Sequence, residues 1–297
     1  MTKSGFISLI GRPNVGKSTL MNQLLGEKVA ITSNKPQTTR NRIQGVYTEG
    51  DGQIVFIDTP GIHKPVHKLG EYMVEAATRS IGDVDMVMLL VEPGHPRQGD
   101  LEIIERLKKQ HAEVILVINK VDTITNDGLL QTIAEFKDLY EFEHIVPVSA
   151  KTGKNKEELL KVLMEQLPEG PFFFPDDMLT DQPERQLVAE LIREKTLHLL
   201  QKEIPHGIAV VIDTFNEREE KEIIDIDATI ICEKNSHKPI IIGKGGRTLK
   251  EIGSRARVDI ESMLGIKVNL QIWVKIKERW RDSDFLIKNF GFDKKEL

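Results

Sequence analysis

Residues near the start of the chain have the types and spacing of a phosphate-binding loop, G-x-x-x-x-G-K-[ST]. Glycines let backbone N–H groups turn towards phosphate oxygens, and a following helix N-terminus adds partial positive charge. Lys17 is expected to reach the β- and γ-phosphates, and the Ser18 hydroxyl to bind Mg²⁺. The loop predicts a nucleoside triphosphate site formed by Gly11, Arg12, Pro13, Asn14, Val15, Gly16, Lys17, Ser18 and Thr19.

An acidic residue, Asp58, directly follows the hydrophobic run 53–57 and precedes Thr59, Pro60 and Gly61. An acid at the end of a strand, downstream of a phosphate loop, is placed to hold Mg²⁺ directly or through water. Gly61 has no side chain, so its N–H can approach a γ-phosphate closely. We therefore predict that Asp58 completes a Mg²⁺ site and that Gly61 contacts phosphate.

Two further polar motifs have the chemistry of a guanine site. A carboxylate such as Asp122 can accept both the ring N–H and the exocyclic amine of guanine, whereas adenine presents an acceptor there. Sites built on such hydrogen bonds reject ill-matched analogues by roughly 10⁴–10⁵. The stem of Lys120 can lie along the base, the backbone of Ala150 can contact the guanine oxygen, and Lys151 can stack on the other side. The predicted guanine site comprises Asn119, Lys120, Asp122, Ser149, Ala150 and Lys151.

Strands and helices must position these side chains. Apolar runs precede the four motifs, and apolar residues with helical spacing lie between them. This alternation predicts an α/β fold, a doubly wound sheet with ligands at the carboxyl ends of its strands. Residues 29–42 are polar and Thr-rich, so we expect an exposed loop there. The predicted strands are 6–10, 43–47, 53–57, 85–91, 114–118 and 145–148, and the predicted helices include 19–25 and 98–110.

A proline-rich stretch divides the chain. We predict a first domain at 1–170, a linker at 171–183, a second domain at 184–277 and a tail at 278–297. The Phe172–Phe174 run is expected to dock on one of the domains. The second domain has the order α-β-β-α-α-β, with predicted strands at 206–214, 223–232 and 266–276 and a helix at 247–264. The tail is expected to form a short helix packed on this domain, with a peripheral membrane contact as the weaker alternative.

A G-x-x-G loop lies between the two adjacent helices of the second domain. Glycines at such a loop let the backbone pass close to single-stranded phosphates. Residues 234–281 carry 12 Lys and Arg against four acids, although the whole chain has a net charge of −5. A basic segment in an acidic protein favours a polyanionic partner. The predicted nucleic-acid contacts are Ile242, Gly243, Lys244, Gly245, Gly246, Arg247 and Lys250.

Composition limits the class of protein. The 297 residues are 39% hydrophobic and 29% charged, which is typical of a soluble globular protein. No continuous apolar run approaches the roughly 20 residues of a membrane span, and no signal peptide is visible at the N-terminus. The single cysteine, Cys232, excludes an intrachain disulfide and fits a reducing compartment. We therefore expect a cytoplasmic protein.

The ordered motifs resemble those of translation-factor-class GTPases. Gln37-Thr38-Thr39-Arg40, together with the region after Leu167, is similar to the Era family, and the resemblance covers essentially the whole chain. It implies a P-loop GTPase domain followed by an α+β type II KH domain, with GTP or GDP and Mg²⁺ as ligands. In that family a switch threonine completes the Mg²⁺ shell when GTP is bound. Thr38 and Thr39 both fit this role, and we favour Thr39. The switch residues implied are Gln37, Thr38, Thr39, Asp58, Thr59, Pro60, Gly61 and Ile62.

Ile62 is a departure from Ras-like GTPases, which place a water-orienting glutamine at this position. An isoleucine cannot orient water, so we identify no side-chain base and predict slow intrinsic hydrolysis. The attacking water is then held by backbone, by the Thr38–Thr39 loop or by K⁺ at Asn14, where related GTPases with this substitution can coordinate K⁺. His63 and His67 lie nearby in a charged stretch that favours a solvated switch over a metal site.

By resemblance, the chain is a GTP-hydrolysing switch that binds single-stranded RNA, namely the 3′ end of 16S rRNA. The implied role is assembly and maturation of the 30S ribosomal subunit, with the chain acting as a monomer. Without the resemblance, the residues predict only a partner that is single-stranded RNA or DNA. The alternative function is an RNA-binding chaperone in which GTP is mainly a structural ligand.

Overall fold

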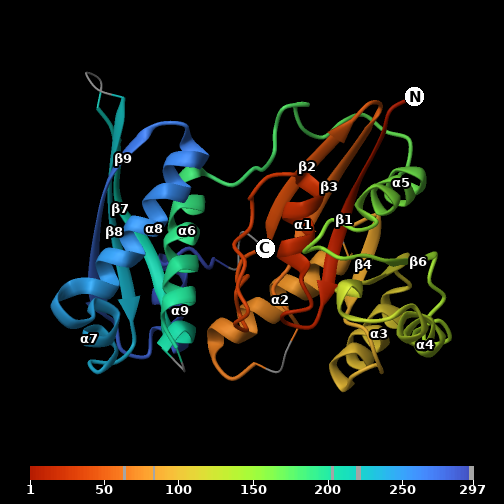
Figure 1. Cartoon of the computed structure of the whole chain (residues 1–297), viewed down its shortest axis with the longest axis horizontal. Coiled ribbons are helices and arrows are strands. Elements are labelled where there is room, and N and C mark those ends of the chain that lie inside the picture. The colour runs from red at the N-terminus through yellow and green to blue at the C-terminus, as the bar shows by residue number, and fades with distance from the viewer. Residues whose placement is uncertain (63–64, 83, 202–203, 219–221, 294–297) are drawn as a thin grey trace. The chain divides into compact units, whose positions relative to one another are not determined.

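The structure is a computed structural model that describes residues 1–62, 65–82, 84–201, 204–218 and 222–293 (Figure 1). It divides the chain into two compact units. The first unit contains the described residues of 1–66 and 70–181, and the second those of 67–69 and 182–296. None of the helices in this described part is long and apolar enough to span a membrane.

A six-stranded sheet forms the centre of the first unit (Figure 1). Its strands β3, β4 and β5 are entirely buried, as expected for strands covered on both faces. All neighbours pair in parallel except β2 and β3, which form an antiparallel hairpin. The doubly wound arrangement predicted from the apolar runs is confirmed. Across the sheet the order is β2 (Ile43–Glu49), β3 (Gly52–Asp58), β1 (Lys3–Gly11), β4 (Met86–Val91), β5 (Val114–Ile118) and β6 (His144–Pro147).

Helices cover both faces of this sheet. α1 (Lys17–Leu25) and α5 (Lys156–Gln166) contribute to the core on one face. On the other face lie α2 (Lys68–Gly82), α3 (Gln98–Gln110) and α4 (Asn126–Phe136). Each helix turns an apolar stripe towards the strands, as Ile103, Ile104 and Leu107 of α3 do. The loops that follow the carboxyl ends of the strands are therefore held between two packed layers.

Residues 171–181, which we predicted to be part of a linker, pack on the first unit. The Phe173 ring lies 4.6 Å from that of Phe6, centroid to centroid. Gln53 Oε1 accepts hydrogen bonds from the backbone N–H of Phe173 at 2.8 Å and Phe174 at 3.0 Å. Farther along, the Val46 N–H of β2 donates to the Leu179 carbonyl at 2.9 Å. The segment thus covers the exposed edge of β2, which would otherwise present unpaired backbone groups.

The second unit has the order α-β-β-α-α-β expected of a type II KH domain. Strand β8 pairs antiparallel with β7 and parallel with β9, and Cys232 at its end is buried. β7 begins three residues later than predicted, because the short 3₁₀ helix η2 (Ile204–Gly207) contains Pro205, which has no N–H for a ladder. The elements are α6 (Glu184–Leu199), β7 (Ala209–Glu217), β8 (Ile223–Cys232), α7 (His237–Ile242), α8 (Arg247–Leu264) and β9 (Lys267–Ile276).

The tail packs on this second unit through Trp280. This side chain is fully buried, and its Nε1 donates to the Gly207 carbonyl at 2.9 Å. The rings of Phe290 and Phe292 lie 5.5 and 6.1 Å from it. A 3₁₀ turn, η4 (Trp280–Asp282), is followed by α9 (Asp284–Asn289). The short helix predicted for the tail is present, and residues 294–297 lie outside the described part.

Candidate functional site: a nucleotide pocket and a glycine-loop groove

The phosphate loop joins β1 to α1 at the carboxyl edge of the sheet. Gly16 has a left-handed φ of 102°, and a Cβ there would lie 2.3 Å from Asn119 Nδ2, so only glycine fits. Lys17 is buried, and its Nζ donates to the carbonyls of Gly11 and Arg12 at 3.2 Å each. Burial lowers the pKa of Lys17 to about 8, although the charge of Asp58 partly opposes this. A phosphate would restore the preference of this side chain for its charged form.

Three predicted Mg²⁺ ligands come together from three separate segments. Ser18 Oγ lies 2.8 Å from Thr39 Oγ1 and donates to Asp58 Oδ2 at 2.5 Å, and Thr39 Oγ1 lies 3.1 Å from the same carboxylate oxygen. Neighbouring ligands of an octahedral Mg²⁺ are about 3 Å apart, which follows from its bond lengths of roughly 2.0–2.1 Å. The Thr38 hydroxyl instead donates to the Lys35 carbonyl at 2.6 Å. The geometry therefore favours Thr39.

The carboxylate of Asp58 also fits a cation. It is fully buried, and Oδ1 has no hydrogen-bond partner within the part of the chain that the structure describes. Burial raises the pKa of Asp58, an effect only partly opposed by the charge of Lys17 and the hydroxyls of Ser18 and Thr39. A divalent cation would satisfy the orphaned oxygen and stabilise the ionised form. The residues present thus suit Mg²⁺.

The remaining residues after β3 are placed by packing. Thr59 is buried and its hydroxyl donates to the Leu9 carbonyl at 2.8 Å, so it anchors the strand end. Gly61 lies so close to Pro13 of the phosphate loop that a Cβ would meet its Cα at 2.8 Å. Ile62 is buried in the core, so it has no access to an attacking water. His63, considered above with His67, lies outside the described residues.

In the guanine motifs the structure separates supporting residues from exposed ones. Asn119 is buried: its Nδ2 donates to the Val15 carbonyl at 2.8 Å, and its Oδ1 accepts from the Ala150 N–H at 2.9 Å. Asn119 therefore ties the phosphate loop to the Ala150 turn. A guanine oxygen that accepts from the Ala150 N–H would have to share this donor with Asn119 Oδ1 or displace that oxygen. Asp122 is exposed, and Ser149 Oγ donates to its Oδ1 at 2.6 Å. That hydrogen bond lowers the pKa of Asp122, which keeps an ionised acceptor facing solvent. Lys151 is also exposed.

Two acids at this edge were missed by sequence reasoning. Glu92 directly follows β4 and contacts Lys120 Nζ, while its second oxygen lies 3.3 Å from Arg12 Nη2. Asp100 of α3, only 1% exposed, accepts from Arg12 Nε at 2.8 Å. Burial raises the pKa of Glu92, but Lys120 and the two nearby guanidiniums, of Arg97 and Arg12, lower it below its ordinary value. The signal that could have found Glu92 is the one used for Asp58, an acid directly after an apolar strand.

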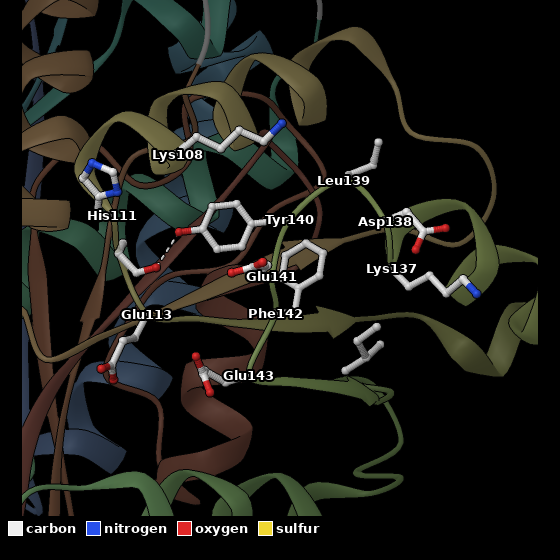
Figure 2. Close-up of a pocket in the computed structure, with 12 residues that line it drawn as sticks. Lys108, His111, Glu113, Lys137, Asp138, Leu139, Tyr140, Glu141, Phe142 and Glu143 are labelled. Atoms are coloured by element: carbon white, nitrogen blue, oxygen red, sulfur yellow. Dashed lines mark hydrogen bonds between the residues drawn. The ribbon is translucent and has the colours of Figure 1, made fainter.

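A cavity of about 920 Å³ lies away from all of these motifs (Figure 2). It is formed around the end of α3, the start of β5 and the segment after α4. The Tyr140 and Phe142 side chains line it, and the Tyr140 hydroxyl donates to the Ala112 carbonyl at 2.5 Å. This cavity lies at the amino end of β5, whereas the predicted motifs follow the carboxyl ends of the strands. It does not belong to the nucleotide site.

In the second unit the G-x-x-G loop joins α7 to α8 and has left-handed glycines. φ is 75° at Gly243, 60° at Gly245 and 77° at Gly246. A Cβ at Gly243 would lie 2.2 Å from Thr248 Oγ1, so this glycine is required by packing as well. The predicted basic residues Lys244, Arg247 and Lys250 are exposed around the loop, and Ile242 is half-buried.

A groove of about 370 Å³ continues from this loop between α8 and β9. Its floor includes Leu270 and Ile272 of β9, and Lys250 and Arg257 of α8 supply positive charge. Bases could lie over the apolar floor while the cations contact phosphates. Sequence reasoning found Lys250 but missed Arg257, which lies seven residues later on the same helix face. The remaining lining residues are Gly246, Leu249, Gly253 and Ser254.

Comparisons with known proteins match both units. A family described as "50S ribosome-binding GTPase" matches residues 6–120, and the KH domain family matches residues 203–281. GTPase Era of Clostridioides difficile (strain 630) is 56% identical over 297 residues, which cover 99% of this chain and 100% of that protein. GTPase Era of Alkaliphilus metalliredigens (strain QYMF) is 55% identical over 292 residues, covering 98% and 99%.

Two solved structures share the fold of nearly the whole chain. A variant of Aquifex aeolicus Era bound to GDP·AlF4⁻ superposes with a TM-score of 0.95 at 42% identity, covering 98% of this chain and 99% of that one. Era in complex with MgGDPNP and nucleotides 1506–1542 of 16S ribosomal RNA matches with the same TM-score, identity and coverage. Because sequence and fold agree over almost the full length, this chain belongs to the Era family of GTPases.

Proposed function

We propose that this chain is a GTP-driven switch that binds the 3′ end of 16S rRNA and assists assembly of the small ribosomal subunit. As a member of the Era family it is a GTP hydrolase whose ligands are GTP or GDP and Mg²⁺. The observation that carries the RNA part of the proposal is the basic groove that leads from the G-x-x-G loop along α8. The Era structure that contains nucleotides 1506–1542 of 16S rRNA supports that choice of RNA.

In the nucleotide pocket, Ser18, Thr39 and Asp58 would hold Mg²⁺, which when bound neutralises charge on the β- and γ-phosphates. Lys17 adds a buried positive charge beside the same phosphates, and Gly61 offers its N–H to the γ-phosphate. On the base side, the exposed Asp122 carboxylate accepts the two N–H groups that distinguish guanine from adenine. The chain's own groups therefore account for binding, charge compensation and base selection.

Hydrolysis by this arrangement is expected to be slow. Ile62 is buried in the core, so the water must be oriented by backbone groups, by the Thr39 loop or by a monovalent cation. Asn14 has a left-handed φ of 67°, and its amide donates to the Asn34 carbonyl at 3.1 Å, so it connects the phosphate loop to the switch loop. We propose K⁺ beside Asn14 as the cation that would assist the water.

The proposal is tested by crosslinking the chain to RNA in cells and sequencing the bound fragments, in preparations held with GTP and with GDP. We expect enrichment of the 3′ end of 16S rRNA, with a yield that depends on the nucleotide. A Gly246→Asp variant serves as the control that should lose these crosslinks. Enrichment of unrelated RNA would contradict the proposal. Equal crosslinking in both nucleotide states would favour the alternative, an RNA chaperone with GTP as a structural ligand.

We also propose that the chain acts as a monomer in the cytoplasm. In the tail, Trp280, Ile287 and Phe292 are buried in the second unit, which leaves Phe285 as its large exposed apolar side chain among the described residues. The tail is therefore better suited to stabilise the KH fold than to bind a membrane surface. Light scattering of the purified protein measures its molar mass, which should be that of a single chain of 33.7 kDa.

A further inference from the structure

One carboxylate, Glu92, connects the guanine motif with the phosphate loop. It is the first residue after β4, at the edge where both motifs lie. One of its oxygens contacts Lys120 Nζ, and the other lies 3.3 Å from Arg12 Nη2 and 3.4 Å from Arg97 Nη1. Its side chain is 20% exposed, so these charges are partly shielded from water. A single acid thus contacts three cations, and two of them, Lys120 and Arg12, belong to the motifs of the nucleotide pocket.

Glu92 is itself held in place. Arg12 is anchored from its other side, because Nε donates at 2.8 Å to Asp100, whose side chain is almost fully buried. The stem of Arg12 also lies against Gly99, where a Cβ would meet its Cδ at 2.7 Å. Asp100 in turn accepts from the Arg97 N–H at 3.0 Å at the start of α3. The carboxylate of Glu92 therefore rests on a network tied to a buried residue.

Lys120 needs such support because its stem is flexible. A lysine has four rotatable methylenes, and its ammonium is free to point in many directions unless acceptors hold it. Here Nζ has two acceptors, Glu92 and the Asn14 carbonyl at 2.8 Å. The Lys120 N–H also donates to Asn119 Oδ1 at 2.8 Å. With both ends fixed, the aliphatic stem is already in place before the base arrives.

We propose that Glu92 is a positioning residue for nucleotide binding, which holds the Lys120 ammonium so that its stem lies along the guanine base. This inference rests on the proposed function, since it assumes that the base lies against Lys120. Glu92 touches neither base nor phosphate and acts through Lys120. Its removal lets Lys120 sample other rotamers, so the nucleotide dissociates faster, whereas the Mg²⁺ cluster and Ile62 are untouched.

The test is a double-mutant cycle on the full-length chain, read as the dissociation rate of a fluorescent GDP analogue. Glu92→Gln should accelerate release about five- to tenfold, within the range for directly contacting side chains. Lys120→Met keeps an apolar stem but has no ammonium, so adding Glu92→Gln to it should change the rate little further. In GTP hydrolysis, Glu92→Gln should raise KM more than it lowers kcat. The matched control is Glu105→Gln, whose partner is the exposed Lys108 at 2.9 Å on α3, and it should leave release unchanged.

The dissociation rates of the four proteins in the cycle can contradict the inference. If Glu92→Gln accelerates release by the same factor with Lys120 and with Met at position 120, Glu92 does not act through Lys120 and the inference is wrong. If Glu92→Gln fails to fold, as judged by its unfolding temperature, Glu92→Asp, which keeps the charge on a shorter arm, takes its place in the same cycle. A wild-type chain that retains no guanine nucleotide would overturn the proposed function itself, which separates the two failures.

Discussion

Replacing Thr39 should damage GTP hydrolysis far more than replacing its neighbour Thr38. The Thr39 hydroxyl lies within 3.1 Å of Asp58 Oδ2 and 2.8 Å of Ser18 Oγ, at the centre of the proposed Mg²⁺ site. The Thr38 hydroxyl donates to the Lys35 carbonyl instead. Thr38→Ala is therefore a matched control, because it removes the same atoms one residue away.

The magnitude follows from the contacts. A hydrogen bond to a charged group contributes about 1.5–3 kcal/mol, and 1.36 kcal/mol corresponds to a factor of ten in rate. Thr39→Ala should thus lower the Mg²⁺-dependent rate by roughly 10- to 150-fold. Thr38→Ala loses a neutral hydrogen bond within the switch loop, which contributes about 0.5–1.5 kcal/mol, so we expect the smaller loss, roughly 2- to 13-fold at most.

The assay is GTP hydrolysis measured across a Mg²⁺ titration, with GDP affinity measured in parallel. Thr39→Ala should shift the titration to higher Mg²⁺ and lower the plateau. GDP affinity should remain near that of the wild type, since the switch threonine is expected to bind the metal only in the GTP state. Equal losses for the two variants, or a larger loss for Thr38→Ala, would refute the assignment of Thr39.

Four further outcomes are expected. Because burial lowers the pKa of Lys17 to about 8, this side chain is increasingly neutral above that pH in the nucleotide-free protein, whereas phosphate favours its charged form. GTP binding should therefore take up a proton and weaken as the pH rises through about 8. The measurement is the calorimetric enthalpy of GTP binding near this pH in buffers of different ionisation heat. A binding enthalpy that is the same in all of these buffers would contradict the proton uptake. Asp122→Asn should shift the preference from guanosine to xanthosine nucleotides, and competition between GDP and XDP measures it; unchanged selectivity counts against the base assignment. Gly246→Asp should abolish RNA binding, because it adds negative charge at a position where a Cβ meets no atom within 4 Å. The control is Gly265→Asp, at an equally open left-handed position after α8, which should leave RNA binding intact. If RNA affinity survives Gly246→Asp, the groove is not the RNA-binding site. Hydrolysis should be faster in K⁺ than in Na⁺ if Asn14 helps to bind a cation, and equal rates would exclude that role.

The sequence alone determined the features that depend on neighbouring residues. The phosphate loop, the acid at the end of β3 and the guanine motifs are short segments whose spacing is set by local backbone geometry. Strands and helices followed from periodicity of apolar residues, and α8 was predicted with the bounds that the structure has, because Gly246 and Gly265 begin and end it. The start of β7 was wrong by three residues, since Pro205 favours a 3₁₀ turn before the strand.

Other features were decided only by the tertiary structure, because they join segments distant in the chain. The proposal of Thr39 rather than Thr38 as a Mg²⁺ ligand depends on how a loop without periodicity meets Ser18 and Asp58. The role of Asn119 as a tie between loops requires Val15 and Ala150 to lie beside it. Glu92 has partners at positions 12 and 120 that no local pattern relates to it. Spacing along the chain identifies the groups that can do the chemistry, whereas the packed sheet decides which of them meet.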